Sequence, residues 1–245
     1  MIKQSFIILD SVTENKERKL WQLCKDWNQF LSSEEELTKD FMIHKNQIED
    51  AKKALYDFDQ THFTKLLPPS MHWRLYDHFK DDAVFLDIET TGFRGGTTVV
   101  GLYDGKDTHI LVRDQTLDSK TLQNLIDRYK LIVTFNGASF DLPVLRNEYG
   151  IDFTKHLHMD LRGVCRKVGL TGGLKNIEKE TGISRDDDVE GISGADAVVL
   201  WKKYKKTGDE QYLNLLVKYN EEDIINLKPL ADMVVPKLWE QVRNL

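Results

Sequence analysis

The chain has little cysteine, no long apolar run and no excess of positive charge. Cys24 and Cys165 are too few and too far apart for a disulfide framework or a zinc cluster, and we expect both to be small apolar residues packed on helices. No apolar stretch approaches the length that spans a membrane, and the first residues lack the apolar core of a signal peptide. These absences predict a cytoplasmic protein without a membrane partner.

The net charge of −6 argues against a protein that coats duplex nucleic acid by general electrostatic attraction. It is compatible with a localised site at which metal ions supply the positive charge. The length of 245 residues, with 40% hydrophobic and 30% charged residues, is typical of a globular chain with one large domain, or with a domain and a small appendage.

Apolar spacing divides the chain into two regions. Residues 1–80 predict a small all-α region, with helices over 15–31 and 34–60 and a further helix or docking segment over 71–79. Residues 81–245 predict an α/β domain in which a mixed five-stranded sheet is flanked by helices. The expected strands are 83–89, 97–103, 108–113, 131–135 and 155–159, and helices dominate beyond residue 160.

Two acids lie at the end of the first expected strand. Asp87 and Glu89 are two residues apart, so their side chains point to the same face of the sheet. Carboxylates this close repel each other and are costly to desolvate, which favours a cation site. A strand end with two solvated acids is the alternative interpretation of this stretch alone.

Two later motifs carry further acids. Asp141 follows the fourth expected strand and begins a helix, a position where the helix dipole also favours an acid. Asn136 and Gly137, just before it, could be ordinary turn residues. Tyr219 and Asp223 are four residues apart on a late helix, so they share one face, which could equally be a solvated one.

Taken in order, these motifs resemble a known family. The series Asp-x-Glu-Thr-x-Gly, Asn-x-x-x-Phe-Asp and Tyr-x-x-x-Asp is similar to the three motifs of the DnaQ-like 3′–5′ exonucleases of the ribonuclease H-like superfamily, and most of all to its YprB-type group. The resemblance covers residues 83–235. Lys218 stands where one subclass has histidine, so the chain resembles the tyrosine subclass. The resemblance implies a ribonuclease H-like fold in which the metal ligands are Asp87, Glu89, Asp141 and Asp223, and Tyr219 completes the catalytic set.

The chemistry of these side chains fits such an activity. Four carboxylates offer hard oxygen ligands to two Mg²⁺ or Mn²⁺ ions, which together activate a water and stabilise a leaving oxygen. Tyr219 has an unperturbed pKa of about 10 and is a poor base, so we expect its hydroxyl to orient the water. We expect a 3′–5′ exonuclease acting on single-stranded DNA or RNA with a free 3′ end, DNA being favoured, in DNA repair or nucleic-acid processing.

Six residues are expected to contact the terminal nucleotides. The backbone around Thr90, Thr91 and Gly92 would hold the last nucleotide. The rings of Phe93 and Phe140 would stack on bases or belong to the core, and the amide of Asn136 would reach the sugar-phosphate.

Two alternative functions belong to other classes. A non-catalytic module would keep the fold and bind nucleic acid or a repair partner. The complete set of acids argues against it, because an idle site has no reason to keep costly carboxylates. A structure-selective endonuclease of the same fold is the other alternative, and an internal nick on a 3′-blocked substrate would favour it.

Several other patterns have structural interpretations. The run His156-Leu-His-Met-Asp160 resembles a binuclear metallohydrolase motif, but Leu161 replaces the histidine that would follow, and Asp160 fits a helix N-cap. Gly172-Gly173 lacks the end of a nucleotide-binding loop and is expected to begin a helix, whose Lys175 could touch the substrate backbone.

The basic-aromatic cluster at 201–206 would contact phosphates or form a solvated helix face. Residues 9–13 resemble a degenerate helix-hairpin-helix phosphate clamp in which Ser11 and Thr13 replace both hairpin glycines. That replacement predicts a mainly structural element, or a substrate or partner surface.

Overall fold

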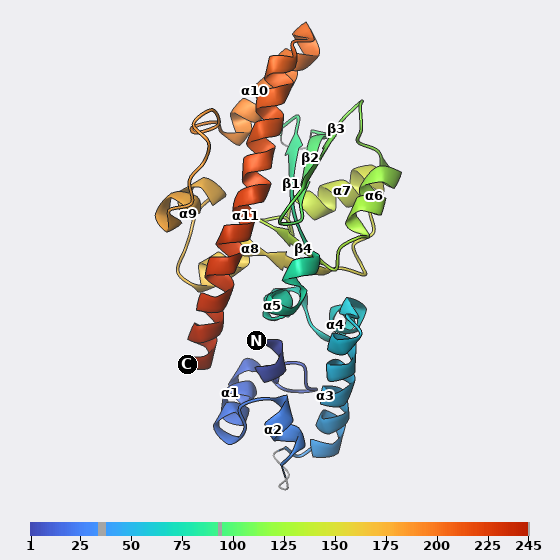
Figure 1. Ribbon diagram of the computed structural model, residues 1–245, viewed down its shortest axis with the longest axis vertical. Coiled ribbons are helices and arrows are strands. Elements are labelled where there is room, and N and C mark those ends of the chain that lie inside the picture. The colour runs from blue at the N-terminus through green and yellow to red at the C-terminus, as the bar shows by residue number, and fades with distance from the viewer. Residues whose placement is uncertain (34–37, 93–94, 245) are drawn as a thin grey trace.

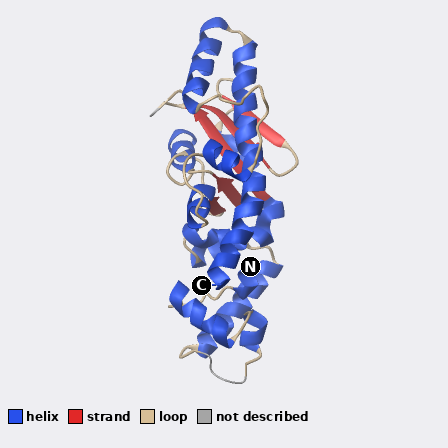
Figure 2. Cartoon of the chain, turned by 90° about the vertical axis from the view of Figure 1, so that its left-hand side faces the viewer, coloured by secondary structure: helices blue, strands red, loops and turns tan. Residues whose placement is uncertain are grey.

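The computed structural model describes residues 1–33, 38–92 and 95–244. Its shape is elongated: a helical region lies at one end, the sheet lies in the middle, and the helix α11 (Glu210–Asn244) runs along most of the length (Figure 1). Seen from the side, the strands lie between helices at the two ends (Figure 2). No helix of the described ranges is both long and apolar enough to cross a membrane.

The described residues form one mixed sheet with the strand order β3-β2-β1-β4-β5. Its central strand, β1, is antiparallel to β2 and parallel to β4. The strands are β1 Ala83–Thr90, β2 Thr97–Tyr103, β3 Thr108–Val112, β4 Leu131–Thr134 and β5 Leu157–Asp160. The expected α/β fold with a mixed five-stranded sheet and a helical N-terminal region is therefore confirmed.

Helices surround this sheet and form the whole N-terminal region of the described chain. Those of the N-terminal region are η1 Ile2–Gln4, α1 Glu14–Leu23, α2 Trp27–Leu31, α3 Phe41–Tyr56, α4 Gln60–Leu66, η2 Pro69–Leu75, α5 Tyr76–Phe79 and η3 Lys80–Asp82. Those of the sheet region, besides α11, are α6 Ser119–Ile126, α7 Asp141–Tyr149, α8 Leu161–Lys167, α9 Leu174–Thr181 and α10 Gly194–Thr207.

The alternation of side chains along β1 decides where its acids lie. Val84, Leu86 and Ile88 belong to a core cluster that also contains the apolar residues of α6 and α7. Ala83 and Phe85 belong to the cluster on the opposite face, together with apolar residues of α8 and α11. Because side chains alternate, the odd-numbered acids of β1 are turned toward α11.

Two expected helices of the N-terminal region are wrong in extent. The helix expected over 15–31 is interrupted between α1 and α2, where Asp26 caps α2 by accepting from Gln29 N at 2.9 Å. Cys24 therefore lies just beyond the end of α1 rather than inside a helix, although it is buried as expected.

The helix expected over 34–60 ends early and is followed by a second one. Phe58 has a φ of 52°, which an α-helix does not allow, and the Asp59 side chain accepts from Thr61 N to cap α4. The described part of the expected helix is α3, which begins only at Phe41, and residues 34–37 lie outside the described chain.

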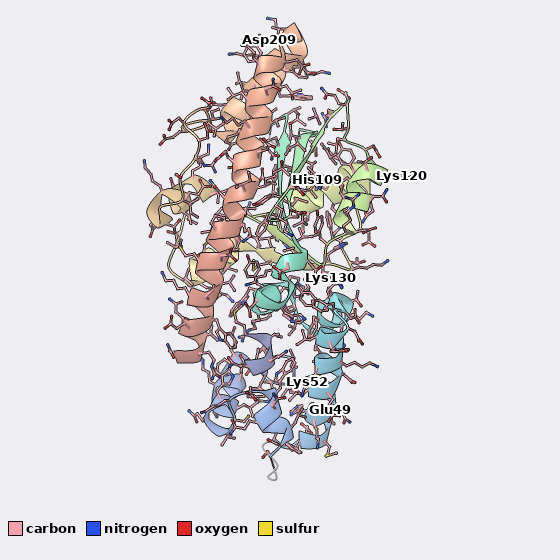
Figure 3. The ribbon with its side chains drawn as sticks, in the orientation of Figure 1. Glu49, Lys52, His109, Lys120, Lys130 and Asp209 are labelled. Carbon is pink, nitrogen blue, oxygen red and sulfur yellow. The ribbon has the colours of Figure 1, made fainter. Side chains whose placement is uncertain are left out.

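The N-terminal region packs directly against the sheet region. One apolar cluster contains residues of α1 to α5 together with residues of β1, β4, β5 and α11. Gln60 Nε2 donates to Lys155 O at 3.1 Å, and His158 N donates to His72 Nδ1 at 3.0 Å. Lys130, which lies where the sheet meets α4 in Figure 3, donates to Phe58 O. The boundary at residues 80 and 81 stays a prediction.

The segment compared above with a helix-hairpin-helix clamp is a series of turns before α1. Ser11 has a φ of 59°, the left-handed conformation that a hairpin glycine favours, and its carbonyl accepts from Lys16 Nζ at 2.8 Å. Thr13 precedes α1 but forms no side-chain capping bond.

Candidate active site

Three acids from two elements form a tight cluster. Oxygen atoms of Asp87 and Glu89 on β1 and of Asp223 on α11 all lie within 4.8 Å of one another. Glu89 and Asp223 are buried, and Asp87 is partly exposed. The cluster arises because the alternation of β1 turns both of its acids toward the helix that crosses that face of the sheet (Figure 1).

The fourth acid, Asp141, lies beside this cluster from the other side of β1. It is the first residue of α7, is buried, and accepts from the backbone N–H of Ile88 at 3.1 Å. Its charge raises the pKa of Asp87, which places it within electrostatic reach of the three. The structure thus gathers all four acids expected from the sequence, three of them within ligand distance of one another.

Asn220 fixes Asp87, and the sequence did not identify it. The fully buried Asn220 donates from Nδ2 to Asp87 Oδ2 at 2.9 Å. Gly101 of β2, paired with Asp87, makes room for it, because a Cβ at Gly101 would lie 2.1 Å from Asn220 Oδ1. Two features of the sequence could have indicated this contact: an amide, Asn220, between Tyr219 and Asp223, and a glycine, Gly101, inside a buried strand.

Arg185 is a second residue that sequence reasoning missed. It lies in the acidic loop between α9 and α10, and its guanidinium donates to Asp223 Oδ1 and to both oxygens of Glu178, at 2.6 and 2.8 Å. Asn226 Nδ2 also donates to Glu178, at 3.1 Å. Arg185 therefore ties the acidic loop to α11, as does Lys218, which pairs with Asp186 at 3.0 Å and Asp188 at 2.6 Å, and one acid of the cluster has a cationic partner.

Tyr219 lies one turn before Asp223 on the same face of α11 and is buried. Lys175 Nζ lies 4.5 Å from the centroid of its ring, and Arg185 lies 5.9 Å from it. Burial, followed by the charges of Asp223, Glu89 and Asp87, raises the pKa of Tyr219. The phenol therefore stays protonated at neutral pH and is available as a hydrogen-bond donor.

The cluster is electrostatically incomplete without added positive charge. Burial and then the neighbouring acids raise the pKa of Asp87, and the same causes raise the pKa of Glu89 to about 8. Burial raises the pKa of Asp141 to about 7. Among the described cations, Lys175 and Arg185 are the ones that act on Glu89 or Asp223. A site made only of oxygen donors fits a hard divalent cation such as Mg²⁺ or Mn²⁺.

Removing the Glu89 charge should make the metal-free protein less sensitive to pH. Folding raises the pKa of Glu89 from 4.5 to about 8, so the stability that its bound proton contributes is present at low pH and is lost as the pH rises through 8. Glu89→Gln is uncharged at every pH and should melt above the parent at pH 9 in EDTA, by about 2–4 °C for each kcal/mol.

The difference should disappear at pH 5, and the exposed Glu240→Gln serves as the control in the same melting series. A Glu89→Gln variant that melts below the parent at pH 9 would show that this carboxylate is a structural partner instead.

The residues expected to contact the last nucleotide differ in how far their groups are already engaged within the protein. The Thr91 N–H donates to Gly96 O at 3.0 Å and is engaged within its own loop. Among the described residues the Gly92 N–H has one contact, a long one of 3.4 Å with Thr90 Oγ1, and the φ of 121° at Gly92 favours glycine. Phe140 is partly exposed beside Asp141, and Phe93 lies outside the described residues.

Asn136 faces away from the acid cluster toward α8. Its φ is 69°, its Oδ1 accepts from Arg162 at 2.7 Å, and its N–H donates to Asp160 at 2.8 Å. Asp160 also caps α8 by accepting from Arg162 N, as predicted. His156 and His158 have separate partners, Asp127 and Thr134, so this run does not form a metal site within the described chain.

The Gly172-Gly173 turn and the basic-aromatic cluster at 201–206 both have partly structural roles. Gly173 is the N-cap of α9, as expected, and Lys175 follows in its first turn. In the cluster at 201–206, Trp201 is buried and Lys205 pairs with Asp114 at 3.1 Å, whereas Lys202 and Lys206 are exposed.

One solved structure supports the fold, and a second has a weaker similarity to the chain. The family B DNA polymerase of the archaeon Pyrobaculum calidifontis matches with a TM-score of 0.51 and 15% identity, over 63% of this chain and 24% of that one. Escherichia coli RNase D, an exoribonuclease involved in structured RNA processing, matches with a TM-score of 0.46 and 16% identity, over 71% of this chain and 43% of that one. The chain thus spans less than half of either protein.

Sequence comparison identifies the family. No curated protein sequence matches the chain at a significant level. The profile of the RNase_H_2 family, described as RNase_H superfamily, matches residues 84–235, which is more than half of the chain and includes all four acids and Tyr219. The chain belongs to the RNase_H superfamily.

Proposed function

We propose that this protein is a metal-dependent 3′–5′ exonuclease that acts on single-stranded nucleic acid, with DNA favoured over RNA. The observation that carries the proposal is the cluster of Asp87, Glu89 and Asp223, whose oxygen atoms lie within 4.8 Å of one another beside a protonated tyrosine. The order of the motifs in the sequence, which resembles the tyrosine subclass of DnaQ-like exonucleases, supports the polarity.

In this proposal the four acids hold two Mg²⁺ or Mn²⁺ ions. Asp87, Glu89 and Asp223 provide most of the ligands, and Asp141 provides the other side of the site. The bound ions supply Lewis-acid activation of a water and stabilise charge on the leaving oxygen of the phosphodiester. Asn220 keeps Asp87 in position, since its amide holds one carboxylate oxygen at 2.9 Å.

Tyr219 orients the attacking water by a hydrogen bond from its hydroxyl, because its raised pKa excludes the role of a base. The Gly92 N–H, whose internal contact is long, is free to donate to the terminal nucleotide. A single strand reaches the cluster directly, whereas a duplex end would have to fray first.

The test uses 5′-labelled DNA and RNA oligonucleotides with Mg²⁺, Mn²⁺ or EDTA. A ladder of products shortened from the 3′ end, absent in EDTA and absent with closed circular strands, supports the proposal. Activity in EDTA, or cleavage of circles as fast as linear strands, refutes it, and an internal nick on a 3′-blocked strand indicates the endonuclease alternative. No cleavage of any substrate, with binding retained, indicates the non-catalytic module.

Tyr219→Phe should lower the single-turnover rate by roughly one to three orders of magnitude, the size of a lost positioning contact. It should leave oligonucleotide binding and the metal dependence of the melting temperature unchanged, because only a hydroxyl is removed. Tyr212→Phe, on the same helix but away from the acids, is the matched control. An undiminished rate in Tyr219→Phe would remove the hydroxyl from the mechanism.

A further inference from the structure

A cavity of about 700 Å³ lies between the N-terminal region and α8, apart from the acid cluster. Pro69, Ser70 and Trp73 of η2 form one wall, and residues of β5, of α8 and of the loop before α9 form the others. The volume is in the range that takes a nucleotide-sized ligand. None of the acids at 87, 89, 141 and 223 lines it, so it is a second candidate binding site.

The rim of the cavity carries an excess of positive charge. Arg162, Arg166 and Lys167 of α8 line it and are exposed. No side-chain hydrogen bond or ion pair of Arg166 or Lys167 exists within the described residues, and Arg162 has a single side-chain partner, Asn136 Oδ1. Three cations without an ion-pair partner among the described residues stand out at one place in a chain with a net charge of −6.

Other groups on the walls neutralise these cations only in part. Asp160 lines the cavity, and its carboxylate, which accepts from the backbone N–H groups of Asn136, Ala138 and Arg162, offsets one of the three positive charges. Burial lowers the pKa of His158 to about 4, so it adds no charge of its own.

Helix stability does not explain the whole set. Arg166 and Lys167 lie in the last turn of α8, where cations interact well with the helix dipole. Arg162 lies in the first turn, where the dipole disfavours a cation. The helix dipole therefore accounts for Arg166 and Lys167 but not for Arg162.

The inner surface of the cavity is apolar. Trp73, Met159 and Leu170 line it, and each is at most 8% exposed. Arg74 lies 4.9 Å from the centroid of the Trp73 ring, so this wall offers a nucleobase apolar contact at the exposed edges of these side chains and not a free ring face. Cations at the rim and an apolar interior together match a nucleotide, with its phosphate outside and its base inside.

Chain connectivity joins this cavity to the acid cluster. Asn136 and Ser139 line the cavity, and the same turn continues through the exposed Phe140 into Asp141. A strand that leaves the cluster along this turn therefore reaches the cavity.

We propose that the cavity binds an upstream nucleotide of the single strand whose 3′ end lies at the acid cluster. The phosphate pairs with Arg162, Arg166 and Lys167, and the base lies against Trp73 and Met159. This inference rests on the proposed function, and it gives the N-terminal region a part in substrate binding through η2.

The test compares two double variants that remove the same charge. Arg166→Gln/Lys167→Gln changes the cavity rim, and Lys53→Gln/Lys120→Gln changes exposed lysines of α3 and α6. Binding of a labelled single strand is measured by fluorescence anisotropy in EDTA over a range of salt concentrations. The rim variant should raise the Kd about tenfold and reduce the salt slope by about 1.4, or 0.7 for each lost phosphate contact, and the control variant should do neither.

A second variant fills the cavity without changing charge. A Cβ at Gly163, which lines the cavity, meets no atom within 4 Å, so the backbone leaves room for a side chain at this position, and Gly163→Phe is the variant chosen. It should weaken binding of the long strand about tenfold while the rate of hydrolysis of p-nitrophenyl thymidine 5′-phosphate, which is too short to reach the cavity, stays at the parental value.

The outcomes separate this inference from the proposed function. If the parent degrades strands and the rim and Gly163 variants bind them as the parent does, the cavity is not a subsite and the exonuclease proposal stands. If both variants also lose hydrolysis of the short ester, they act on the acid cluster and the inference is wrong. A parent that binds through the rim but cleaves nothing upholds the cavity and refutes the exonuclease.

Discussion

Asp223→Asn should lower the rate of nucleotide release by roughly 10³-fold, the size of effect that follows the loss of one group of a preorganised charged site. The substitution keeps the shape of the side chain but removes a charged ligand from a cluster whose oxygen atoms lie within 4.8 Å of one another. The fold should survive, because Arg185 keeps both of its bonds to Glu178. The measurement is a single-turnover rate with Mn²⁺, together with the melting temperature with and without the ion.

Glu222→Gln is the matched control for this experiment. Glu222 is the neighbouring residue on α11, and its carboxylate has only a weak contact, 3.4 Å, with the Asp186 N–H. We expect its rate to stay within a few-fold of the parent. If Asp223→Asn digests DNA at the parental rate and still gains the parental stabilisation from Mn²⁺, α11 does not contribute a ligand and the site has been assigned to the wrong helix.

Glu17→Ala should destabilise the whole protein by about 3–5 kcal/mol, because it leaves a buried charge without its partner. Arg74 NH2 lies 3.0 Å from Glu17 Oε2, and both side chains are completely buried. Glu17 Oε1 also accepts from Ser5 Oγ and from the backbone of Phe6, each at 2.7 Å. The Ile7 N–H donates to the same oxygen at 3.1 Å, so the loss leaves the guanidinium without its charged partner and three further donors without this acceptor. Urea unfolding, followed by circular dichroism, gives the free energy of unfolding.

Lys205→Ala is the control for the buried pair, because it breaks an exposed ion pair with Asp114 and should cost less than about 1 kcal/mol. A single unfolding transition in Glu17→Ala would show that residues 1–80 unfold with the sheet region, as their shared apolar cluster suggests. Two transitions would show that the N-terminal region unfolds separately, and a change below 1 kcal/mol would contradict the importance of the pair.

The sequence predicted the sheet and the acids because both follow from local rules. The alternation in β1 places Asp87 and Glu89 on one face, and helical spacing places Tyr219 beside Asp223, whatever the rest of the chain does. The strands are short apolar runs bounded by turns, so their limits were also close to those observed. The resemblance of the motifs supplied the order in which these pieces assemble.

The sequence could not predict the partners that long-range packing supplies. Arg185 looked like one cation in an acidic loop, and only the packing of that loop on α11 brings it to Asp223. Asn220 and Gly101 are informative only as a pair, since the amide fits because β2 has no side chain at that place. The break at Phe58 also escaped, because the helix was expected to run on to residue 60 and the positive φ of Phe58 is seen only in the structure.

The long helix α11 links the acid cluster to the N-terminal region, yet its backbone is not continuous in hydrogen bonding. Pro229 and Pro236 lack the N–H groups that would bond to the carbonyls of Ile225 and Asp232. The segment beyond Pro236, where Trp239 packs on Trp21, can fray without breaking the ladder that holds Tyr219 and Asp223. Amide hydrogens beyond Pro236 should therefore exchange with solvent faster than those of the turn that carries Tyr219 and Asp223. Local unfolding at the carboxyl end of α11 should not reach that turn.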